Sequence, residues 1–248
     1  MKITFLGTNG WYTSETGNTV CALIETANEY IVLDAGNGIY KLDRHIPEGS
    51  AKPIYLFLSH FHLDHIEGLH TLAKFKFEAG LTIIGQKGTG EILGQIVRQP
   101  YTVPFSNLRY RVEVLEVPED AARLPFLEDA RFLVHASSCL GYRFRIDGKV
   151  IAYCTDTGVC DNMIELSRDA DLLISECAFR FGQSNSEWPH MNPDDAVRVA
   201  RTAGAKRLAL THFDAYLYPS LEDRKEIEER LEVAFPLIVA RDGTEIFL

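Results

Sequence analysis

Four side chains able to bind a metal ion stand close together in the segment SHFHLDH, at residues 59–65. The segment follows the apolar run IYLFL, a predicted strand, and precedes the helical pattern HIEGLHTLAKF. Two residues separated by one position on extended backbone point the same way, so His60 and His62 can bind one ion. At the helix start, Asp64 and His65 can offer a carboxylate and an imidazole to a second ion. The segment therefore predicts a metal site with two ions within reach.

Three more potential ligands stand at similar places farther along the chain. His135 follows the run RFLV, Asp156 follows VIAYCT and His212 follows RLALT, so each comes at the end of a predicted strand. Strand ends in layered α/β folds meet at one rim of a sheet, a usual place for a binding site. We therefore expect all three to converge on the histidine-rich segment. The leftover histidines, His45 and His70, are expected to be solvated or structural.

The remaining pattern predicts an α/β protein. Short apolar or alternating runs recur along the whole chain and predict strands. Helical spacing appears in HIEGLHTLAKF, GEILGQIVRQ, PDDAVRVARTAG and LEDRKEIEERLEVAF, and Asn192 and Gly204 are the expected caps of the third. Asp147-Gly148 predicts a two-residue hairpin turn. Because no linker or charge block divides the 248 residues, we expect one domain over residues 1–248, with two mixed sheets flanked by helices.

Composition limits the partners and the compartment. The chain has 25 basic and 35 acidic residues and a formal net charge of −10, which disfavours large RNA but allows a small anion at a dication site. Its five cysteines are odd in number and form no CxxC pair, which suits a reducing cytoplasm. No apolar run approaches the roughly 20 residues of a membrane span. We expect a cytoplasmic protein with no membrane partner, and a homodimer stays open.

The ordered residues resemble the metallo-β-lactamase superfamily, whose HxHxDH motif is present here and is followed by a His, an Asp and a final His. The resemblance extends from LGTNG near the start to THF at residues 211–213. It implies a four-layer αββα sandwich and two Zn²⁺ ions, with Mn²⁺ or Fe as alternatives for such mixed ligands. The implied ligands are His60, His62 and His135 for the first ion, Asp64, His65 and His212 for the second, and Asp156 as the bridge.

The second half narrows this resemblance. The stretch SECAFRFGQSNSEWPHMNPDD is similar to ribonuclease Z and its phosphodiesterase relatives, in which a Glu precedes a His just before a helix. Glu176 and His190 match those positions. The likeness implies that His190 donates a proton to the leaving alkoxide and that Glu176 orients it; the alternative for His190 is to cap the next helix. With Asp64 they form the expected catalytic set. Zinc β-lactamases use a Cys where this chain has Asp156, so the resemblance disfavours a lactam as the substrate.

Ribonuclease Z enzymes that mature tRNA carry a projecting arm between the second-half ligands. Only twenty residues separate His135 from Asp156 in this chain, and two predicted strands and the hairpin turn fill them. The arm therefore has no room, and the chain resembles the arm-less phosphodiesterases of this branch. The cysteine pairs of the relative from the phosphonate pathway, which hold an extra structural zinc, are also missing.

The leading interpretation is a dizinc phosphodiesterase that hydrolyses a small or cyclic phosphodiester through a metal-bridging hydroxide. Three alternatives stay open: a ribonuclease Z-like endonuclease acting at RNA 3′ ends, a thioester, lactone or lactam hydrolase on the same fold, and a metal-storing or structural domain. The choice of substrate depends on the pocket wall, whose candidate residues are Phe179, Arg180, Phe181, Trp188, Phe213, Tyr216 and Tyr218.

Supporting residues are also predicted. Ring N–H groups of ligand histidines usually donate to a neighbouring acceptor, and the candidates for that role are Asp34, Ser59 and Thr211. Within the histidine-rich segment, Phe61 and Leu63 are expected to pack in the core and so to fix the loop.

Overall fold

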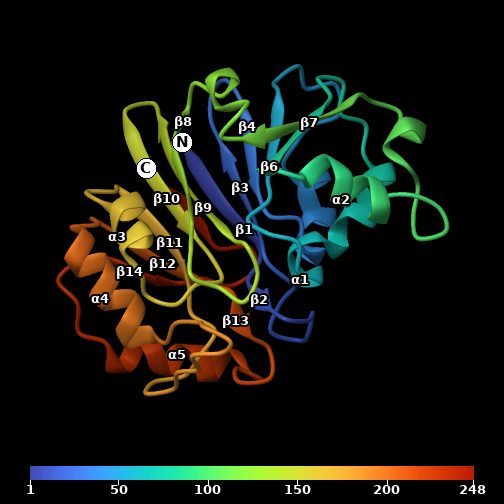
Figure 1. Ribbon diagram of the computed structural model, residues 1–248. Helices are drawn as coiled ribbons and strands as arrows, with labels where there is room; N and C mark the ends of the chain where they lie inside the picture. Colours follow the sequence, from blue (N-terminus) through green and yellow to red (C-terminus); the bar gives the residue numbers. More distant parts are fainter.

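Two mixed β-sheets lie face to face at the centre of the molecule (Figure 1). The computed structural model describes all 248 residues. The first sheet has seven strands, in the order β15 (Glu245–Phe247), β1 (Lys2–Gly7), β3 (Cys21–Glu25), β4 (Tyr30–Leu33), β5 (Ile54–Phe57), β6 (Leu81–Gln86) and β7 (Val112–Val117). The second has six, in the order β14 (Leu237–Val239), β12 (Leu208–Thr211), β11 (Leu172–Glu176), β10 (Lys149–Cys154), β9 (Leu140–Ile146) and β8 (Leu127–Phe132).

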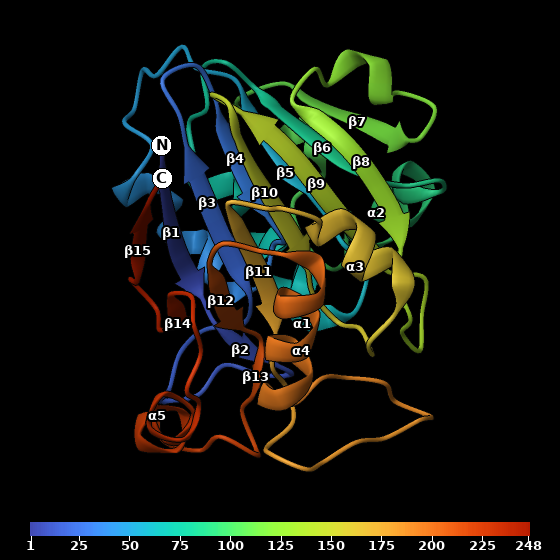
Figure 2. The ribbon, with the colours of Figure 1, turned by 90° about the vertical axis from the view of Figure 1, so that its left-hand side faces the viewer.

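Helices cover the outer face of each sheet and complete the predicted four layers. Figure 2 shows α3 (Asp161–Ser167) and α4 (Pro193–Ala203) in front of the second sheet, and α5 (Leu221–Arg230) contacts β14. The first sheet is covered by α2 (Thr89–Ile96) and by 3₁₀ segments at Asn37–Arg44 and Glu67–Lys74, the second of which follows α1 (Leu63–Ile66). Shorter 3₁₀ turns span Phe105–Asn107 and Ala121–Arg123. None of these helices has both the length and the apolar character needed to cross a membrane.

Central strands are buried on both faces, because one face meets the other sheet and the other face meets helices. In β5, Phe57 points toward the second sheet, where its ring lies 5.1 Å from that of Tyr142 and 4.9 Å from that of Phe144. Its neighbour Leu56 belongs instead to the core beneath the helices of the first sheet. This double burial explains why the strands read as continuous apolar runs in the sequence.

The predicted turn and caps are confirmed. Asp147 and Gly148 have φ values of 51° and 74°, the left-handed conformation that a two-residue hairpin turn of this kind requires. The side chain of Asn192 accepts a hydrogen bond from the backbone N–H of Asp195 at 3.0 Å and so caps α4, which ends at Gly204 with φ 71°.

The prediction of one regular helix for HIEGLHTLAKF is wrong. α1 makes a single turn, and the chain continues as a 3₁₀ helix. The reason lies at Gly68, whose N–H donates to the carbonyl of Ala35 at 2.8 Å rather than to a carbonyl of its own helix. A Cβ at position 68 would lie 2.3 Å from the carbonyl oxygen of Gly36. Close packing against the loop after β4 therefore replaces regular helical bonding.

Candidate metal centre

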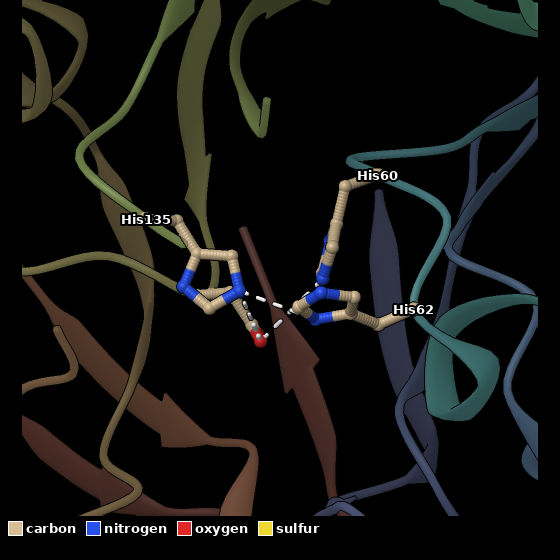
Figure 3. Close-up of side chains that lie close together, drawn as sticks. His60, His62 and His135 are labelled. Atoms are coloured by element: carbon tan, nitrogen blue, oxygen red, sulfur yellow. Dashed lines mark hydrogen bonds and ion pairs between the residues drawn. The ribbon is translucent and has the colours of Figure 1, made fainter. Parts of the chain in front are cut away.

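The predicted ligands converge at one end of the two sheets. Residues 60–65 follow β5 in the first sheet, while His135, Asp156 and His212 follow β8, β10 and β12 in the second. Because β10, β11 and β12 are parallel, their carboxyl ends share one edge. Figure 3 shows the rings of His60 and His62 reaching from one side of the centre and the ring of His135 from the other.

The first group of donors consists of His60, His62 and His135. Nε2 of His135 lies 3.2 Å from Nδ1 of His62. One carboxylate oxygen of Asp156, Oδ2, lies 3.6 Å from Nε2 of His60 and 3.7 Å from Nε2 of His135. Burial lowers the pKa of all three imidazoles below the usual value. The rings are therefore neutral at pH 7, the form in which imidazole binds metals.

The second group of donors consists of Asp64, His65 and His212. Nε2 of His65 and Nε2 of His212 lie 3.1 Å apart, and Oδ2 of Asp64 is 3.3 Å from the latter. The other oxygen of Asp156, Oδ1, lies 3.1 Å from Nε2 of His65 and 3.0 Å from Nε2 of His212. Asp156 thus turns one oxygen to each group.

The carboxylates at the second group favour positive charge on their neighbours. Burial opposes protonation of His65 and His212, but the carboxylate of Asp156 outweighs it and raises the pKa of both imidazoles. Burial likewise opposes ionisation of Asp64, yet the charges of His65 and His212 hold the pKa of this carboxyl well below its usual range. Buried carboxylates that lie so close together must be neutralised by positive charge, either on protonated histidines or on metal ions.

The donor atoms are spaced as neighbours around a small cation. Zinc holds its ligand atoms at about 2.0–2.1 Å, so a tetrahedral site separates them by about 3.4 Å. The separations given above for the two groups lie between 3.0 and 3.7 Å. Nε2 of His60 is moreover buried without any hydrogen-bond partner. A buried nitrogen of this kind is costly unless its lone pair is used, so the residues present fit divalent metal ions.

Asp34, directly after β4, holds the ring of His65 in place. Its carboxylate accepts hydrogen bonds from Nδ1 of His65 at 2.8 Å, from the N–H and hydroxyl of Ser59 at 2.7 and 2.8 Å, and from the hydroxyl of Tyr153 at 2.6 Å. Because Asp34 keeps a proton on Nδ1, Nε2 is the nitrogen of His65 that can bind a metal ion. The prediction for Asp34 agrees with these contacts, and that for Ser59 agrees with the 3.0 Å between its Oγ and Nδ1 of His60. That for Thr211 was wrong, because its buried hydroxyl has no hydrogen-bond partner.

Replacing Asp34 with alanine should weaken metal binding about 10- to 100-fold, the usual effect of losing such a supporting carboxylate. The expected reason is that the ring of His65 loses its fixed orientation. Competition with a chromogenic chelator measures the affinity. Tyr153→Phe is the matched control: it removes one of the four hydrogen bonds and keeps the carboxylate, so the loss should be smaller. Equal affinities of Asp34→Ala and the parent protein would contradict this role.

The turn after β1 packs against the second group. Its short strand β2 (Asn9–Gly10) pairs with β13 (Phe213–Asp214), which directly follows His212. A Cβ at Gly10 would lie 2.5 Å from Cε1 of His212, so only glycine leaves room for that ring. The next N–H, that of Trp11, donates to Oδ2 of Asp64 at 2.7 Å. The sequence showed this glycine after a strand, but not what it approaches.

Glu176 and His190 form a second buried unit beside the metal ligands. Nδ1 of His190 lies 2.8 Å from Oε1 of Glu176, whose other oxygen accepts the backbone N–H groups of Ala178 and Met191. Burial alone would lower the pKa of His190, but the carboxylate of Glu176 raises it to about 9. One ring nitrogen of His190 also lies within 4.8 Å of a carboxylate oxygen of Asp156 and of a ring nitrogen of His212. The ring does not cap α4, because Asn192 does.

The candidate wall residues separate into two kinds. Phe213 and Tyr218 are buried in the core, and Arg180 is held by ion pairs with acidic residues of α5. Trp188 is 48% exposed, and its ring is nearly parallel to that of His62, with an angle of 7° and 5.4 Å between centroids. Tyr216 is exposed as well. Trp188 and Tyr216 are thus the exposed members of the set, whereas Phe179 and Phe181 are half-buried and the ring of Phe179 lies 5.6 Å from that of His190.

Leu63, expected in the core, is 75% exposed, whereas Phe61 does pack beneath the helices of the first sheet. The histidine-rich segment leaves the sheet at this point, so its residues do not alternate between core and surface as a strand would. His70 is exposed and lies outside both groups of donors.

Comparison with known proteins agrees with this geometry. A family model described as a β-lactamase superfamily domain matches residues 29–213, a range that includes every donor of both groups. The chain is 30% identical to the probable metallo-hydrolase YhfI of Bacillus subtilis over 218 residues, 86% of each protein. It is 25% identical to a ribonuclease Z of Methanosarcina acetivorans, with 96% of this chain and 97% of that protein covered.

Solved structures show the same fold. The crystal structure of YhfI superimposes with a TM-score of 0.77 at 24% identity, covering 99% of this chain and 98% of that one. Human tRNase Z, short form, gives a TM-score of 0.73 at 24% identity, with 100% and 99% covered. With the family model matching most of its length, this chain belongs to the metallo-β-lactamase superfamily and is a metal-dependent hydrolase.

Proposed function

We propose that this protein binds two zinc ions and hydrolyses a small or cyclic phosphodiester. The observation that carries the proposal is the carboxylate of Asp156, which turns Oδ2 toward His60 and His135 and Oδ1 toward His65 and His212. A carboxylate between two sets of donors is arranged to serve two cations. The first ion would be held by His60, His62 and His135, the second by Asp64, His65 and His212, and both by Asp156.

Two bound divalent cations lower the pKa of water toward neutrality and neutralise charge on a phosphoryl oxygen. Four of the five cysteines, Cys21, Cys139, Cys154 and Cys177, are buried, and burial raises the pKa of each thiol; the fifth, Cys160, belongs to none of the groups of donors. A buried thiol in this state is unreactive. The proposed reaction is therefore direct attack by water.

His190 is the proposed proton donor. Its raised pKa keeps the imidazole protonated at pH 7, and Nδ1 is bound by Glu176, so Nε2 is the nitrogen free to donate. A leaving alkoxide is a strong base and needs this proton as the P–O bond breaks. Glu176, itself fixed by backbone N–H groups, holds the imidazolium in position.

Relatives named ribonuclease Z make RNA the second candidate substrate. The alignment with the Methanosarcina acetivorans protein extends over 302 positions, more than the 248 residues of this chain, so that relative carries inserted segments. The alignment with YhfI needs far fewer inserted positions, since it covers 86% of both proteins over 218 residues. The short chain and its charge of −10 favour the small substrate.

The test is a panel of substrates for the zinc-loaded protein. It contains bis(p-nitrophenyl) phosphate, a cyclic nucleotide, a precursor tRNA, a thioester and a lactone, and kcat/KM is measured for each. We expect the phosphodiesters to rank first, with activity abolished by chelation and restored by zinc. His70→Ala, at an exposed histidine outside the donors, should keep full activity. A higher kcat/KM for the tRNA, thioester or lactone would overturn the proposal.

A further inference from the structure

Exposed apolar side chains follow the donor segments around the centre. Leu63 precedes Asp64, Val134 precedes His135, Val159 follows Asp156 by three residues, and Tyr216 follows His212 by four. With Trp11 and Trp188 they form what we call the apolar rim, defined by six exposed residues: Trp11, Leu63, Val134, Val159, Trp188 and Tyr216. Apolar side chains gathered at one exposed place mark a binding surface.

Backbone contacts join the rim into two halves. On one side Val134 forms an isolated β-bridge with Gly158. Gly158 in turn lies close to Pro189, the residue after Trp188, because a Cβ added to this glycine would lie 3.2 Å from Cβ of Pro189. On the other side the N–H of Trp11 binds Asp64 at 2.7 Å, and the pairing of β2 with β13 brings the segment of Tyr216 to the same turn. One half thus lies beside the first group of donors and the other beside the second.

The ring of Trp188 packs against two of the donor histidines. Its ring lies parallel to His62 at 5.4 Å and edge-on to His135 at 5.6 Å, yet 48% of the residue is exposed. An indole with one face against a ligand histidine keeps its other face for a planar partner. That partner would lie directly beside the first group of donors.

None of the lysine and arginine side chains pairs with the carboxylates of the centre. No Lys or Arg forms an ion pair with Asp64, Asp156 or Glu176, and Arg180, the nearest in sequence to Trp188, is held by Asp223 and Glu226. Nucleic acids are bound mainly through several phosphates at once. A ligand fitting this surface carries its negative charge at the donors and a planar apolar group at the rim.

Resting on the proposed function, we infer that the substrate is a phosphodiester with one phosphate and a planar aromatic group, and that this group stacks on the open face of Trp188. Nucleobases and simple aryl groups share this chemistry. Stacking of a base on an aromatic side chain contributes enough to change binding about 5- to 150-fold.

The experiment compares two substrates that differ only in the ring. Adenosine 2′,3′-cyclic phosphate carries a base, and 1-O-methylribose 2′,3′-cyclic phosphate does not. In Trp188→Ala we expect kcat/KM to fall about 10- to 100-fold for the first and less than about twofold for the second, with partial recovery in Trp188→Phe. Tyr101→Ala, at an exposed aromatic residue following α2, should change neither. Methyl p-nitrophenyl phosphate tests whether an aryl group replaces the base.

A binding measurement separates this inference from the proposed function. The chain has only two tryptophans, so Trp11→Phe leaves Trp188 as the sole indole, and adenosine 2′-monophosphate should quench its fluorescence whereas ribose 5-phosphate should not. If both cyclic phosphates are hydrolysed but Trp188→Ala slows them equally, the phosphodiesterase stands and the stacking role is wrong. If neither is hydrolysed and quenching still occurs, the ring site stands and the proposed reaction fails. Without quenching and without a ring preference, the inference is overturned.

Discussion

Replacing Asp156 with alanine is expected to abolish the binding of both metal ions at stoichiometric concentration and to lower kcat/KM on the order of 10³-fold or more. Asp156 is the residue that offers an oxygen to each group of donors, at 3.0 and 3.1 Å from His212 and His65 and at 3.6 Å from His60. Without it the nitrogens of His65 and His212, 3.1 Å apart, keep only the carboxylate of Asp64 beside them. Elemental analysis after dialysis gives the zinc content.

The matched control for that substitution is Asp43→Ala. Asp43 lies on the surface and pairs with Lys74, and both side chains are largely exposed. Exposed pairs of this kind contribute little to stability, so zinc content and turnover should equal those of the parent protein. Two equivalents of zinc retained by Asp156→Ala would show that the bridging position is not needed and would remove the basis of the two-ion proposal.

The second large effect is expected in His190→Ala, which should keep its zinc and lose about 10²- to 10⁴-fold in kcat, the range for a missing proton donor. The loss should depend on the leaving group. An alkoxide needs the proton and should show the full effect, whereas p-nitrophenolate is stable as an anion and should show little. Equal losses for the two leaving groups would indicate that His190 acts on structure or metal binding rather than as an acid.

Glu176→Gln tests the pair by pH. Protonated His190 is the active form, so activity should fall as the pH rises through its pKa of about 9. Burial lowers the pKa of His190 and the Glu176 carboxylate raises it, so removing the charge lets burial dominate. The alkaline fall in kcat should then move to lower pH in the variant. An unchanged pH profile would contradict the assignment of Glu176.

The sequence predicted the donor set because each donor has a local signal. The HxHxDH segment is contiguous, and His135, Asp156 and His212 each stand after an apolar run. Parallel pairing then brings the ends of β10 and β12 to one edge without further information. The fold followed from the same runs, because strands buried on both faces are recognisable by continuous hydrophobicity.

What the sequence did not reveal depends on contacts between distant residues. Tyr153 donates to Asp34 across 119 positions, and nothing in VIAYC distinguishes this Tyr from a core residue, although a buried hydroxyl usually finds a partner. Gly10 and His212 are similarly remote. Leu63 was assigned to the core from its apolar character alone, but the local path of the chain turns it outward. Such pairs are fixed by how the two sheets meet, which no local pattern encodes.

The division of the donors between the sheets has a mechanical consequence. Residues 60–65 belong to the connection after β5, and His135, Asp156 and His212 belong to connections of the other sheet. An ion bound by both sets of residues would therefore link the two sheets. Ions bound only by the assembled molecule raise its unfolding free energy by mass action. Removal of the ions by a chelator should therefore let the two sheets move independently. A protease should then cut the connections that carry the donors before it cuts other loops.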